Sequence, residues 1–360
     1  MIRFEPRQSV PPALALFAPV AAGAAALALA AVPLAFAGAP ILAAYGLMLT
    51  GAFGSLFAFS ETLTRTTPLI LTGLAAAVAF RAKLWNIGGE GQLYAGAIAA
   101  VAVGAGAISG PPVVMIPLVL VAGALAGAAL MLGPALLKLK FGADEVVTTL
   151  LLNFVMLLFV QMMLEGPLQD PMSLGWPQSA PIVDAAVLPP LLGRLRVHSG
   201  LLIALVAAVL VFILIRRTVW GAEIRAVGEN ASAARYAGIP VTATMVRVAV
   251  ISGGLAGLAG VGEVAGLKGY LTSDLSPGFG YAGIVVAMLA GLSPLGVVAA
   301  ALFIAGVFVG ADSMSRGLGV SSYLADLVVA LSLLCVLVGG FVTRFRIRFT
   351  AAPSAAREGG

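Results

Sequence analysis

Long apolar stretches recur along most of the chain, and no other feature constrains its fold as strongly. Only helices and closed barrels satisfy the backbone inside a bilayer, and these runs are longer than the ~10-residue alternating segments of a barrel. The sequence therefore predicts an all-α polytopic membrane protein with about ten transmembrane helices, some short or broken. The apolar windows cover residues 13–36, 66–85, 91–108, 112–136, 144–164, 199–216, 244–266, 281–294, 296–311 and 321–341.

The composition agrees with a membrane location. Charged residues make up 10% of the 360 residues, against about 25% in soluble proteins. The 44 glycines suit close packing of helices in lipid. A single cysteine, Cys335, lies within an apolar run and excludes an internal disulfide, so we interpret it as a small buried apolar side chain.

The first apolar window resembles a secretion signal, because Arg3 and Arg7 precede it and Ala35-Phe36-Ala37 resembles a cleavage site. Its length of about 24 residues exceeds the 7–15 apolar residues of a typical signal. We therefore expect a retained first span. An eleventh apolar stretch, residues 41–60, is rich in glycine and aromatic residues, and we expect it to be interfacial or re-entrant.

The basic residues predict the orientation, because cytoplasmic loops collect lysine and arginine. With ten spans and the N-terminus inside, five of the 20 basic residues lie outside: Arg65, Arg194, Arg196, Lys268 and Arg316. Counting 41–60 as a further span destroys this bias. We therefore expect a cytoplasmic segment 1–12, a membrane domain 13–343 and a cytoplasmic tail 344–360. The net charge of +5 needs no nucleic-acid partner, since the cytoplasmic leaflet attracts basic residues.

Residues 165–198 form the longest predicted extracytoplasmic loop. It is either a docking surface for an extracytoplasmic partner or a solvated connector. It contains the only histidine, His198, which has no Cys, His or carboxylate at ligand spacing. The loop is therefore not a metal site.

The longest polar stretch of mixed charge, Gly221–Pro240, falls in the predicted cytoplasmic region 217–243. It contains two helix-capable pieces, 222–227 and 231–237. Asn230 is typical of a helix N-cap and Gly238 of a C-cap. Short capped helices at a membrane surface form a rigid knob that a soluble partner can grip; an ordinary cytosolic loop is the alternative.

A second polar group interrupts the apolar windows within residues 80–94, where three glycines loosen a helix. Its polar side chains are Asn86, Glu90 and Gln92. Transporters build solute sites from broken helices, and an intramembrane carboxylate is functional by default. The alternative is a membrane-edge turn with a salt bridge to Arg81 or Lys83. The glycine spacing does not fit a dinucleotide-binding motif.

A third group opens the window at 144–164. Asp144 and Glu145 favour a helix N-terminus. Asn153 and Gln161 follow on roughly one helix face, which either lines a pore or bonds a neighbouring helix.

A fourth group begins with Gly253, Gly257 and Gly260, whose spacing predicts a small-residue packing face. Glu263 follows, and then the aromatic residues Phe279 and Tyr281. Such rings fit a site for a planar ring or a sugar, and equally fit simple packing.

The motifs of common enzymes are absent from the sequence. It has no GxxxxGK[ST] nucleotide loop, no CxxC and no HExxH. One histidine makes a Ser/His/Asp set implausible. The sequence therefore predicts a protein that is not an enzyme and binds no metal.

Together these residues resemble the permease subunits of bacterial ABC importers for simple sugars and nucleosides, over roughly Thr66 to Phe341. The Asn-Ile-Gly-x-Glu-Gly-Gln pattern is most like the nucleoside-type permeases, and like the longer of two paralogous permeases found together. The first 60 residues match weakly. The matching strings are Thr67-Pro-Leu-Ile-Leu-Thr-Gly73, Asn86-Ile-Gly-Gly-Glu-Gly-Gln92, Glu145-Val-Val-Thr-Thr149 with Asn153, Arg225-Ala-Val-Gly-Glu-Asn230 and Ala233-Ala-Arg-Tyr-Ala-Gly-Ile239.

The resemblance implies the ABC importer permease fold, in which two permeases pair around a central path. It implies three kinds of partner in the bacterial inner membrane system: an ATPase subunit, a second paralogous permease and an extracytoplasmic solute-binding protein. ATP is then bound by the ATPase, and this chain needs no cofactor. The solute is a nucleoside, a simple sugar or, as in other branches, a vitamin.

The resemblance also implies roles for particular positions. The predicted solute path comprises Asn86, Glu90, Gln92 and Asn153, to which we add Glu263, Phe279 and Tyr281. The predicted coupling helix, which contacts the ATPase, carries Glu223, Arg225, Gly228, Asn230, Ala233, Ala234 and Gly238.

Two other functions fit the residues. An ion-coupled secondary transporter can carry a proton on Glu90 or Glu263, although we find no internal repeat of the kind common in that class. A membrane scaffold without transport also tolerates polar residues at broken helices.

Overall fold

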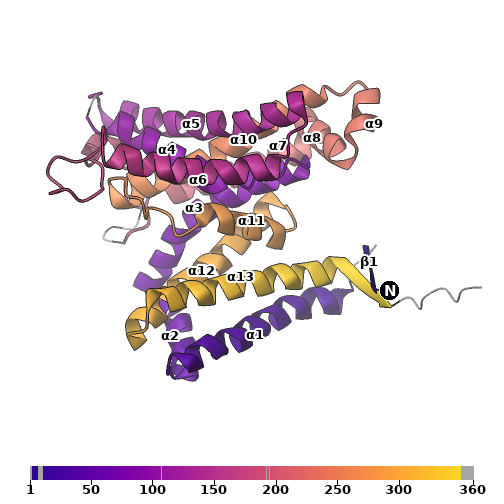
Figure 1. Cartoon of the computed structure of the whole chain (residues 1–360), viewed down its shortest axis with the longest axis horizontal. Helices are drawn as coiled ribbons and strands as arrows, with labels where there is room; N and C mark the ends of the chain where they lie inside the picture. Colours follow the sequence, from indigo (N-terminus) through magenta and orange to yellow (C-terminus); the bar gives the residue numbers. More distant parts are fainter. Residues whose placement is uncertain (1, 7–10, 107, 192, 194, 350–360) are drawn as a thin grey trace, which may run out of the picture.

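The computed structural model describes residues 2–6, 11–106, 108–191, 193 and 195–349. Within these ranges the chain forms thirteen α-helices, and several of the long ones run roughly along the long axis of the molecule (Figure 1). They are α1 (Pro12–Phe36), α2 (Ile41–Phe53), α3 (Leu56–Arg81), α4 (Gly89–Gly104), α5 (Pro112–Phe141), α6 (Glu145–Leu164), α7 (Gly200–Arg217), α8 (Val219–Glu229), α9 (Ala231–Tyr236), α10 (Val241–Val261), α11 (Phe279–Leu289), α12 (Pro294–Leu318) and α13 (Ser322–Arg344).

Seven helices of the described part are long and apolar enough to cross a membrane. They are α3, α5, α6, α7, α10 with its continuation to Lys268, α12 and α13. Each of the ten predicted windows falls on a helix, so the all-α polytopic class is confirmed. The windows 91–108 and 281–294 correspond to the short helices α4 and α11, of 16 and 11 residues.

The stretch 41–60 is divided between two helices, α2 and the start of α3. It is therefore not the single interfacial or re-entrant element that the sequence predicted. The chain breaks at Gly54-Ser55, where the Ser55 hydroxyl accepts a hydrogen bond from the amide of Ala58 and caps α3. The predicted window 66–85 is consequently wrong at its start, since α3 begins at Leu56. The 13 residues of α2 rise about 20 Å, less than the ~30 Å hydrocarbon thickness.

The interior is built around a glycine-mediated crossing of α4, α5 and α10. A Cβ atom on Gly257 of α10 would overlap the carbonyl oxygen of Gly123 in α5, and one on Gly260 would overlap that of Leu93 in α4. Gly253 likewise lies against the carbonyl of Gly127. The predicted small-residue packing face is confirmed, because only residues without a side chain let these backbones touch.

One short sheet was not predicted. Strand β1 (Ile2–Pro6) pairs antiparallel with β2 (Phe345–Phe349), with Phe4 opposite Ile347. Polar and apolar residues alternate in both segments, and this alternation is a strand signal. The sequence prediction assigned both segments to cytoplasmic ends without a strand. Residues 1, 7–10 and 350–360 of the predicted cytoplasmic ends lie outside the described residues, as does Arg194.

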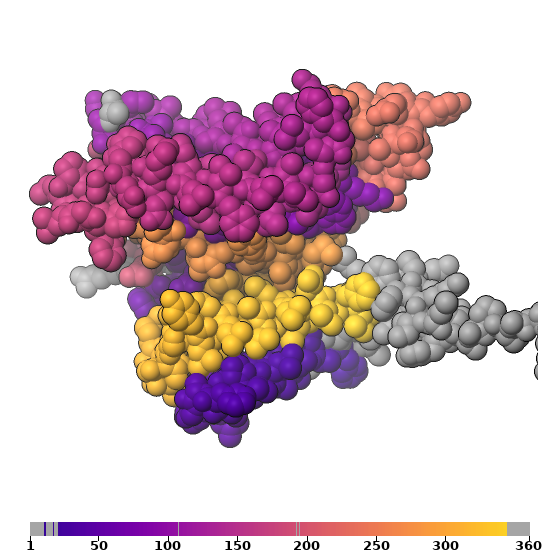
Figure 2. All heavy atoms as spheres, in the orientation of Figure 1, coloured from indigo at the N-terminus to yellow at the C-terminus, as the bar shows by residue number. Residues whose placement is uncertain are grey.

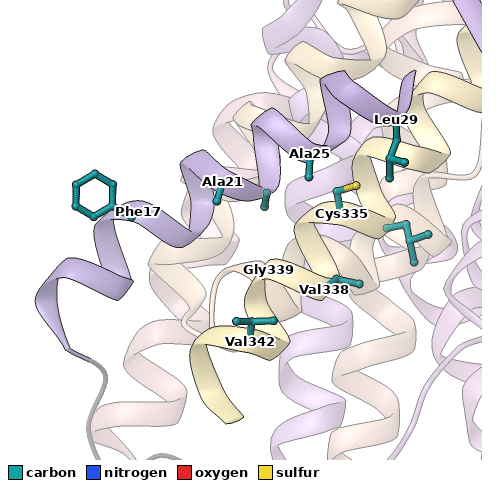
Figure 3. Close-up of a pocket in the computed structure, with 10 residues that line it drawn as sticks. Phe17, Ala21, Ala25, Leu29, Cys335, Val338, Gly339 and Val342 are labelled. Carbon is teal, nitrogen blue, oxygen red and sulfur yellow. The ribbon is translucent and has the colours of Figure 1, made fainter. Parts of the chain in front are cut away.

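Helices α1 and α13 form a layer at one side of the molecule, the indigo and yellow layer of Figure 2. Between them lies a cleft of about 470 Å³ whose lining includes Phe17, Leu29, Cys335 and Val338 (Figure 3). Cys335 is buried, as expected for an apolar role. A polar solute needs hydrogen-bonding partners, which this apolar lining does not provide.

The connections between helices collect at two ends of the molecule. Helices α8 and α9 lie at one end, together with the α3–α4 turn, where Lys83 Nζ donates to the carbonyl of Glu229 at 3.2 Å (Figure 1). The α6–α7 loop lies at the opposite end, where the amide of Val183 donates to the carbonyl of Gly104 at 2.8 Å. We name these the α8–α9 end and the loop end.

The base of the α6–α7 loop is packed into the protein rather than fully solvated. His198 is buried, and its Nδ1 accepts a hydrogen bond from the amide of Gly200 at 3.2 Å. Its ring lies against Gly266, where any Cβ would overlap it. Among the described residues no group of three or more His, Cys, Asp or Glu is placed to hold a metal ion.

Burial of His198 makes stability depend on pH. It lowers the pKa of the imidazole from 6.5 to about 4, so between these values the unfolded chain binds a proton that the folded chain does not. The free energy of unfolding then falls as the pH falls, by at most about 1.4 kcal/mol per pH unit. Between pH 7 and 5, we expect the melting temperature in detergent to drop more for the wild type than for His198→Asn. Equal drops in melting temperature for the two proteins would show that groups other than His198 cause the pH dependence.

Candidate functional site

The first turn of α4 is held by a closed pair of side-chain amides. Asn86 Nδ2 donates to Gln92 Oε1, and Gln92 Nε2 donates to Asn86 Oδ1, both at 2.9 Å. Asn86 also donates to the hydroxyl of Ser252 in α10, which donates to the carbonyl of Ala75 in α3. The break between α3 and α4 is therefore tied to two further parts of the bundle.

Helix α6 binds the backbone of the same break through Asn153. Its Oδ1 accepts from the amide of Gly91 at 2.8 Å, and its Nδ2 donates to the carbonyl of Ile87 at 2.9 Å and to the Tyr281 hydroxyl at 3.2 Å. Asn153 is fully buried. The predicted polar face of α6 thus contacts another helix at Asn153, whereas Gln161 is exposed and bonds Glu165.

Glu90 joins the N-termini of two short helices. It lies in the first turn of α4, and its Oε2 accepts a hydrogen bond of 2.7 Å from the amide of Gly280 in the first turn of α11. A Cβ on Gly280 would overlap the amide nitrogen of Glu90, so only glycine allows this approach. The Glu90 side chain therefore ties the start of α4 to the start of α11.

The structure brings six of the seven predicted solute-path residues to this junction. Asn86, Glu90, Gln92 and Asn153 are all buried, and their hydrogen bonds hold the break in place. Phe279 is buried too, with its ring 5.9 Å from that of Phe308. Tyr281 is 37% exposed, so it is the member of the group that presents a ring at a surface.

Glu263 lies apart from this junction. It belongs to a π-helix, Gly262–Lys268, that extends α10, and it is buried near the loop end. The positive charges of Lys268 and Arg65 act on it. A Cβ atom added to the neighbouring Gly262 would lie 4.0 Å from the His198 ring. Sequence proximity suggested one site for Glu263 and Phe279, but the charged neighbours of Glu263 are Lys268 and Arg65, whereas Phe279 packs against Phe308.

Several polar residues of the junction were missed by the sequence analysis. Thr149 accepts from the amide of Ile87 at 3.2 Å, and Thr72 donates to the carbonyl of Phe279 at 3.0 Å. The Tyr94 hydroxyl donates to the carbonyl of Ser273 at 2.7 Å. Their signal in the sequence is weak, because single Ser, Thr and Tyr residues in apolar windows also bond within their own helix.

Helices α8 and α9 form the predicted capped pair. The Asn230 side chain accepts from the amides of Ser232 and Ala233 at 3.0 Å each, and Gly238 follows α9 with a φ of 83°. The predicted N-cap is confirmed, and Gly238 has the left-handed backbone expected of a C-cap glycine. Ala234 is buried, whereas the rest of α9 is exposed, and Tyr236 is 97% exposed.

Helix α8 is fastened to the membrane helices through charged groups. Glu223 accepts from Arg247 of α10 at 2.8 Å, and the Arg247 guanidinium lies 4.8 Å from the centre of the Trp220 ring. Arg225 donates to the carbonyl of Ile215 in α7. These contacts explain why Glu223 and Arg225 are only partly exposed.

The far end of α8 lies directly on the α3–α4 turn. Gly228 is buried, and a Cβ atom there would overlap the carbonyl oxygen of Arg81. Asn86, which organises the start of α4, follows Arg81 by five residues. The backbone of α8 therefore lies in direct contact with the turn that leads into the polar junction.

Comparison with known proteins identifies the family. Residues 58–337 match the model for the permease component of the branched-chain amino acid transport system. The chain belongs to this permease family. The resemblance inferred from its motifs is thereby confirmed, and the chain is the membrane-spanning permease component of a transporter.

Individual relatives are similar over most of their length. The glucose ABC transporter permease protein TsgB13 of Haloferax volcanii is 37% identical over 96% of this permease and 93% of the relative. The guanosine ABC transporter permease protein NupP of Bacillus subtilis is 37% identical over 86% of this permease and 88% of the relative. A second guanosine ABC transporter permease protein of that organism, NupQ, is 28% identical over 67% of this permease and 77% of the relative.

Loss of Asn153 is expected to destabilise this permease. Alanine would leave the buried amide of Gly91 and the partly buried carbonyl of Ile87 without their partner, and an unpaired buried group costs about 1–3 kcal/mol. We expect Asn153→Ala to lower the melting temperature in detergent clearly, whereas Gln161→Ala, an exposed amide of the same helix, leaves it unchanged. Indistinguishable melting of the two variants would contradict this role of Asn153.

Proposed function

We propose that this permease is the membrane subunit of an ABC importer that moves nucleosides or related small solutes, such as simple sugars, through the bacterial inner membrane. The observation that carries the proposal is the contact of Gly228 in α8 with the α3–α4 turn. It links an exposed pair of capped helices to a buried polar junction. The sequence has no nucleotide-binding loop of its own, so a separate ATPase supplies the energy.

The partners follow from this arrangement. The ATPase binds the α8–α9 end, with Asn230, Ala233 and Gly238 at the exposed contact and Gly228 and Ala234 holding the element in place. A second permease pairs with this one, as supported by the two guanosine permease proteins of Bacillus subtilis. A solute-binding protein delivers solute to the loop end. Both termini lie in the cytoplasm.

The solute path passes the junction of α4 and α11. Its half-exposed Tyr281 ring is suited to stacking on a nucleobase or a sugar face, and the Tyr281 hydroxyl is already oriented by Asn153. Asn86, Glu90 and Gln92 keep the broken helix in shape around it. The guanosine and glucose permeases among the relatives support this solute class.

The test is stimulation of ATP hydrolysis by loaded receptor. The purified complex of this permease, its paralogue and the ATPase is reconstituted in nanodiscs and mixed with receptor that carries guanosine, glucose or riboflavin. We expect hydrolysis to rise with the guanosine-loaded receptor. No rise with any solute, in a complex shown to be assembled, would overturn the proposal, and a rise with riboflavin alone would overturn the solute class.

A further inference from the structure

An ion pair that the polar junction does not use joins two of the membrane helices. Arg65 of α3 donates through Nη2 to Asp312 Oδ2 of α12. The two side chains keep 28% and 32% of their surface exposed. The sequence analysis placed each residue just outside an apolar window, whereas in the structure both lie within helices long and apolar enough to cross a membrane.

The depth of the pair in these helices places it inside the bilayer. Arg65 is nine residues from the start of α3, or about 14 Å, and Asp312 is six residues from the end of α12, or about 9 Å. The 26 and 25 residues of the two helices rise about 39 and 38 Å, against ~30 Å of hydrocarbon. A bilayer centred on them covers both charges. Charged groups at such a depth face protein or a water-filled cavity rather than lipid.

Further charged residues surround the pair. Glu61, one turn before Arg65 on α3, has its carboxylate 3.6 Å from the guanidinium of Arg196 in the α6–α7 loop. The positive charge of Arg65 also acts on Glu263, which is buried in the π-helix. The centre of a packed subunit interface is depleted of charge. The open side of this cluster therefore fits a water-filled path better than an apolar contact with another subunit.

In the other direction the pair leads to the start of α11. Phe308 lies one turn before Asp312 on α12, and its ring is 5.9 Å from that of Phe279. Thr72 lies two turns after Arg65 on α3 and donates to the carbonyl of Phe279 at 3.0 Å. The ion pair therefore lies between the loop end and the first turn of α11, where a solute that moves along the proposed path would pass it.

The pair has hydrogen-bonding atoms to spare. Asp312 Oδ1 and Arg65 Nη1 make no hydrogen bond with any residue that the structure describes. They offer an acceptor and a donor side by side. A hydroxyl group both donates and accepts, so one of two neighbouring hydroxyls can donate to Oδ1 while the other accepts from Nη1. The ion pair itself stays intact, and hydrogen bonds to charged groups are the strong ones.

We propose that Arg65 and Asp312 form a specificity site that binds vicinal hydroxyl groups of the solute, an inference that rests on the proposed importer function. Nucleosides and simple sugars differ in most of their structure but share such hydroxyls, on the ribose or on the sugar ring. A site of this kind accepts both classes of solute and rejects analogues without hydroxyls, because its charged groups then lose their partners.

The experiment compares uptake of guanosine with uptake of its dideoxy analogue, which lacks both ribose ring hydroxyls. Proteoliposomes contain the complete complex, and each solute is supplied as saturated receptor, so that receptor affinity does not enter the ratio of the two rates. In Arg65→Leu with Asp312→Leu, we expect the preference for guanosine to fall at least about tenfold. The control Arg316→Leu, which alters an exposed arginine one turn further along α12, should keep the wild-type ratio.

Melting temperature and assembly separate binding from a structural role. Replacement of a whole ion pair by apolar residues is often neutral for stability, so the double leucine variant should melt like the wild type and keep its paralogue. If it does not fold, Arg65→Gln with Asp312→Asn keeps a neutral bridge between the helices, and we expect its preference for guanosine to fall several-fold, since uncharged hydrogen bonds are weaker.

Three results would overturn the inference. An unchanged preference in a folded, assembled variant makes the pair a structural link only, and the proposed function stands if the wild type imports guanosine. Loss of the paralogue from the variant complex assigns the pair to the interface between subunits. Absence of guanosine uptake by the wild-type complex removes both the specificity site and the proposed function.

Discussion

Replacement of Gly228 by alanine is expected to reduce solute uptake roughly tenfold or more while the permease stays folded. The added methyl group would overlap the Arg81 carbonyl oxygen, a backbone atom that cannot turn away. Forcing atoms into such a contact costs about 1–3 kcal/mol, and 1.4 kcal/mol is a factor of ten in an equilibrium. Helix α8 must then move off the α3–α4 turn, which breaks the contact through which the proposed function couples the ATPase to the polar junction.

The matched control is Gly133→Ala in α5, where an added Cβ meets no atom within 4 Å. Uptake, ATP hydrolysis and melting temperature are measured for both variants in the reconstituted complex. We expect Gly228→Ala to keep hydrolysis and lose uptake, and Gly133→Ala to keep both. Unaltered uptake by Gly228→Ala would show that α8 does not transmit the work of the ATPase.

Replacement of Gly257 by alanine is expected to destabilise the whole bundle. Its added methyl group would overlap the carbonyl oxygen of Gly123 and press on Gly127, at the point where α10 crosses α5. Both helices would have to separate, and overpacking of this kind costs up to about 3 kcal/mol or more. By the scaling of soluble domains, this lowers the melting temperature by roughly 5–10 °C.

Gly254→Ala provides the control in the same helix, because a Cβ there lies 3.5 Å from the Ala124 carbonyl oxygen, an ordinary contact. The two variants are compared by thermal melting and by the fraction that remains monodisperse after heating. We expect Gly254→Ala to behave like the wild type. Equal stability of Gly257→Ala would mean that the crossing tolerates a larger separation than its backbone contacts indicate.

The features that the sequence predicted well are those set by local chemistry. Asn230 caps α9 because its side chain reaches amides two and three residues ahead, and Gly238 is left-handed because few other residues adopt that backbone at low cost. The glycines of α10 were recognisable by their spacing. Each of these signals is contained in a short window, so one sequence suffices to find it.

The features that it missed depend on contacts between distant segments. Nothing near Glu90 indicates that its partner is the amide of Gly280, 190 residues away. Glu263 precedes Phe279 by 16 residues, yet a π-helix and a returning loop place it in different surroundings. The Gly54-Ser55 break was hidden because the apolar character continues on both sides of it. Periodicity locates helices, whereas these pairings follow from how the helices pack.

Uptake of labelled guanosine into proteoliposomes tests the central claim most directly. The vesicles contain this permease, its paralogue, the ATPase and the receptor, and each component is omitted in turn. We predict uptake that requires ATP and every component. Gly228→Ala should reduce this uptake roughly tenfold or more, and Gly133→Ala should leave it unchanged. Solute accumulation by this chain alone, without ATP and under an imposed proton gradient, would contradict the account and identify an ion-coupled transporter instead.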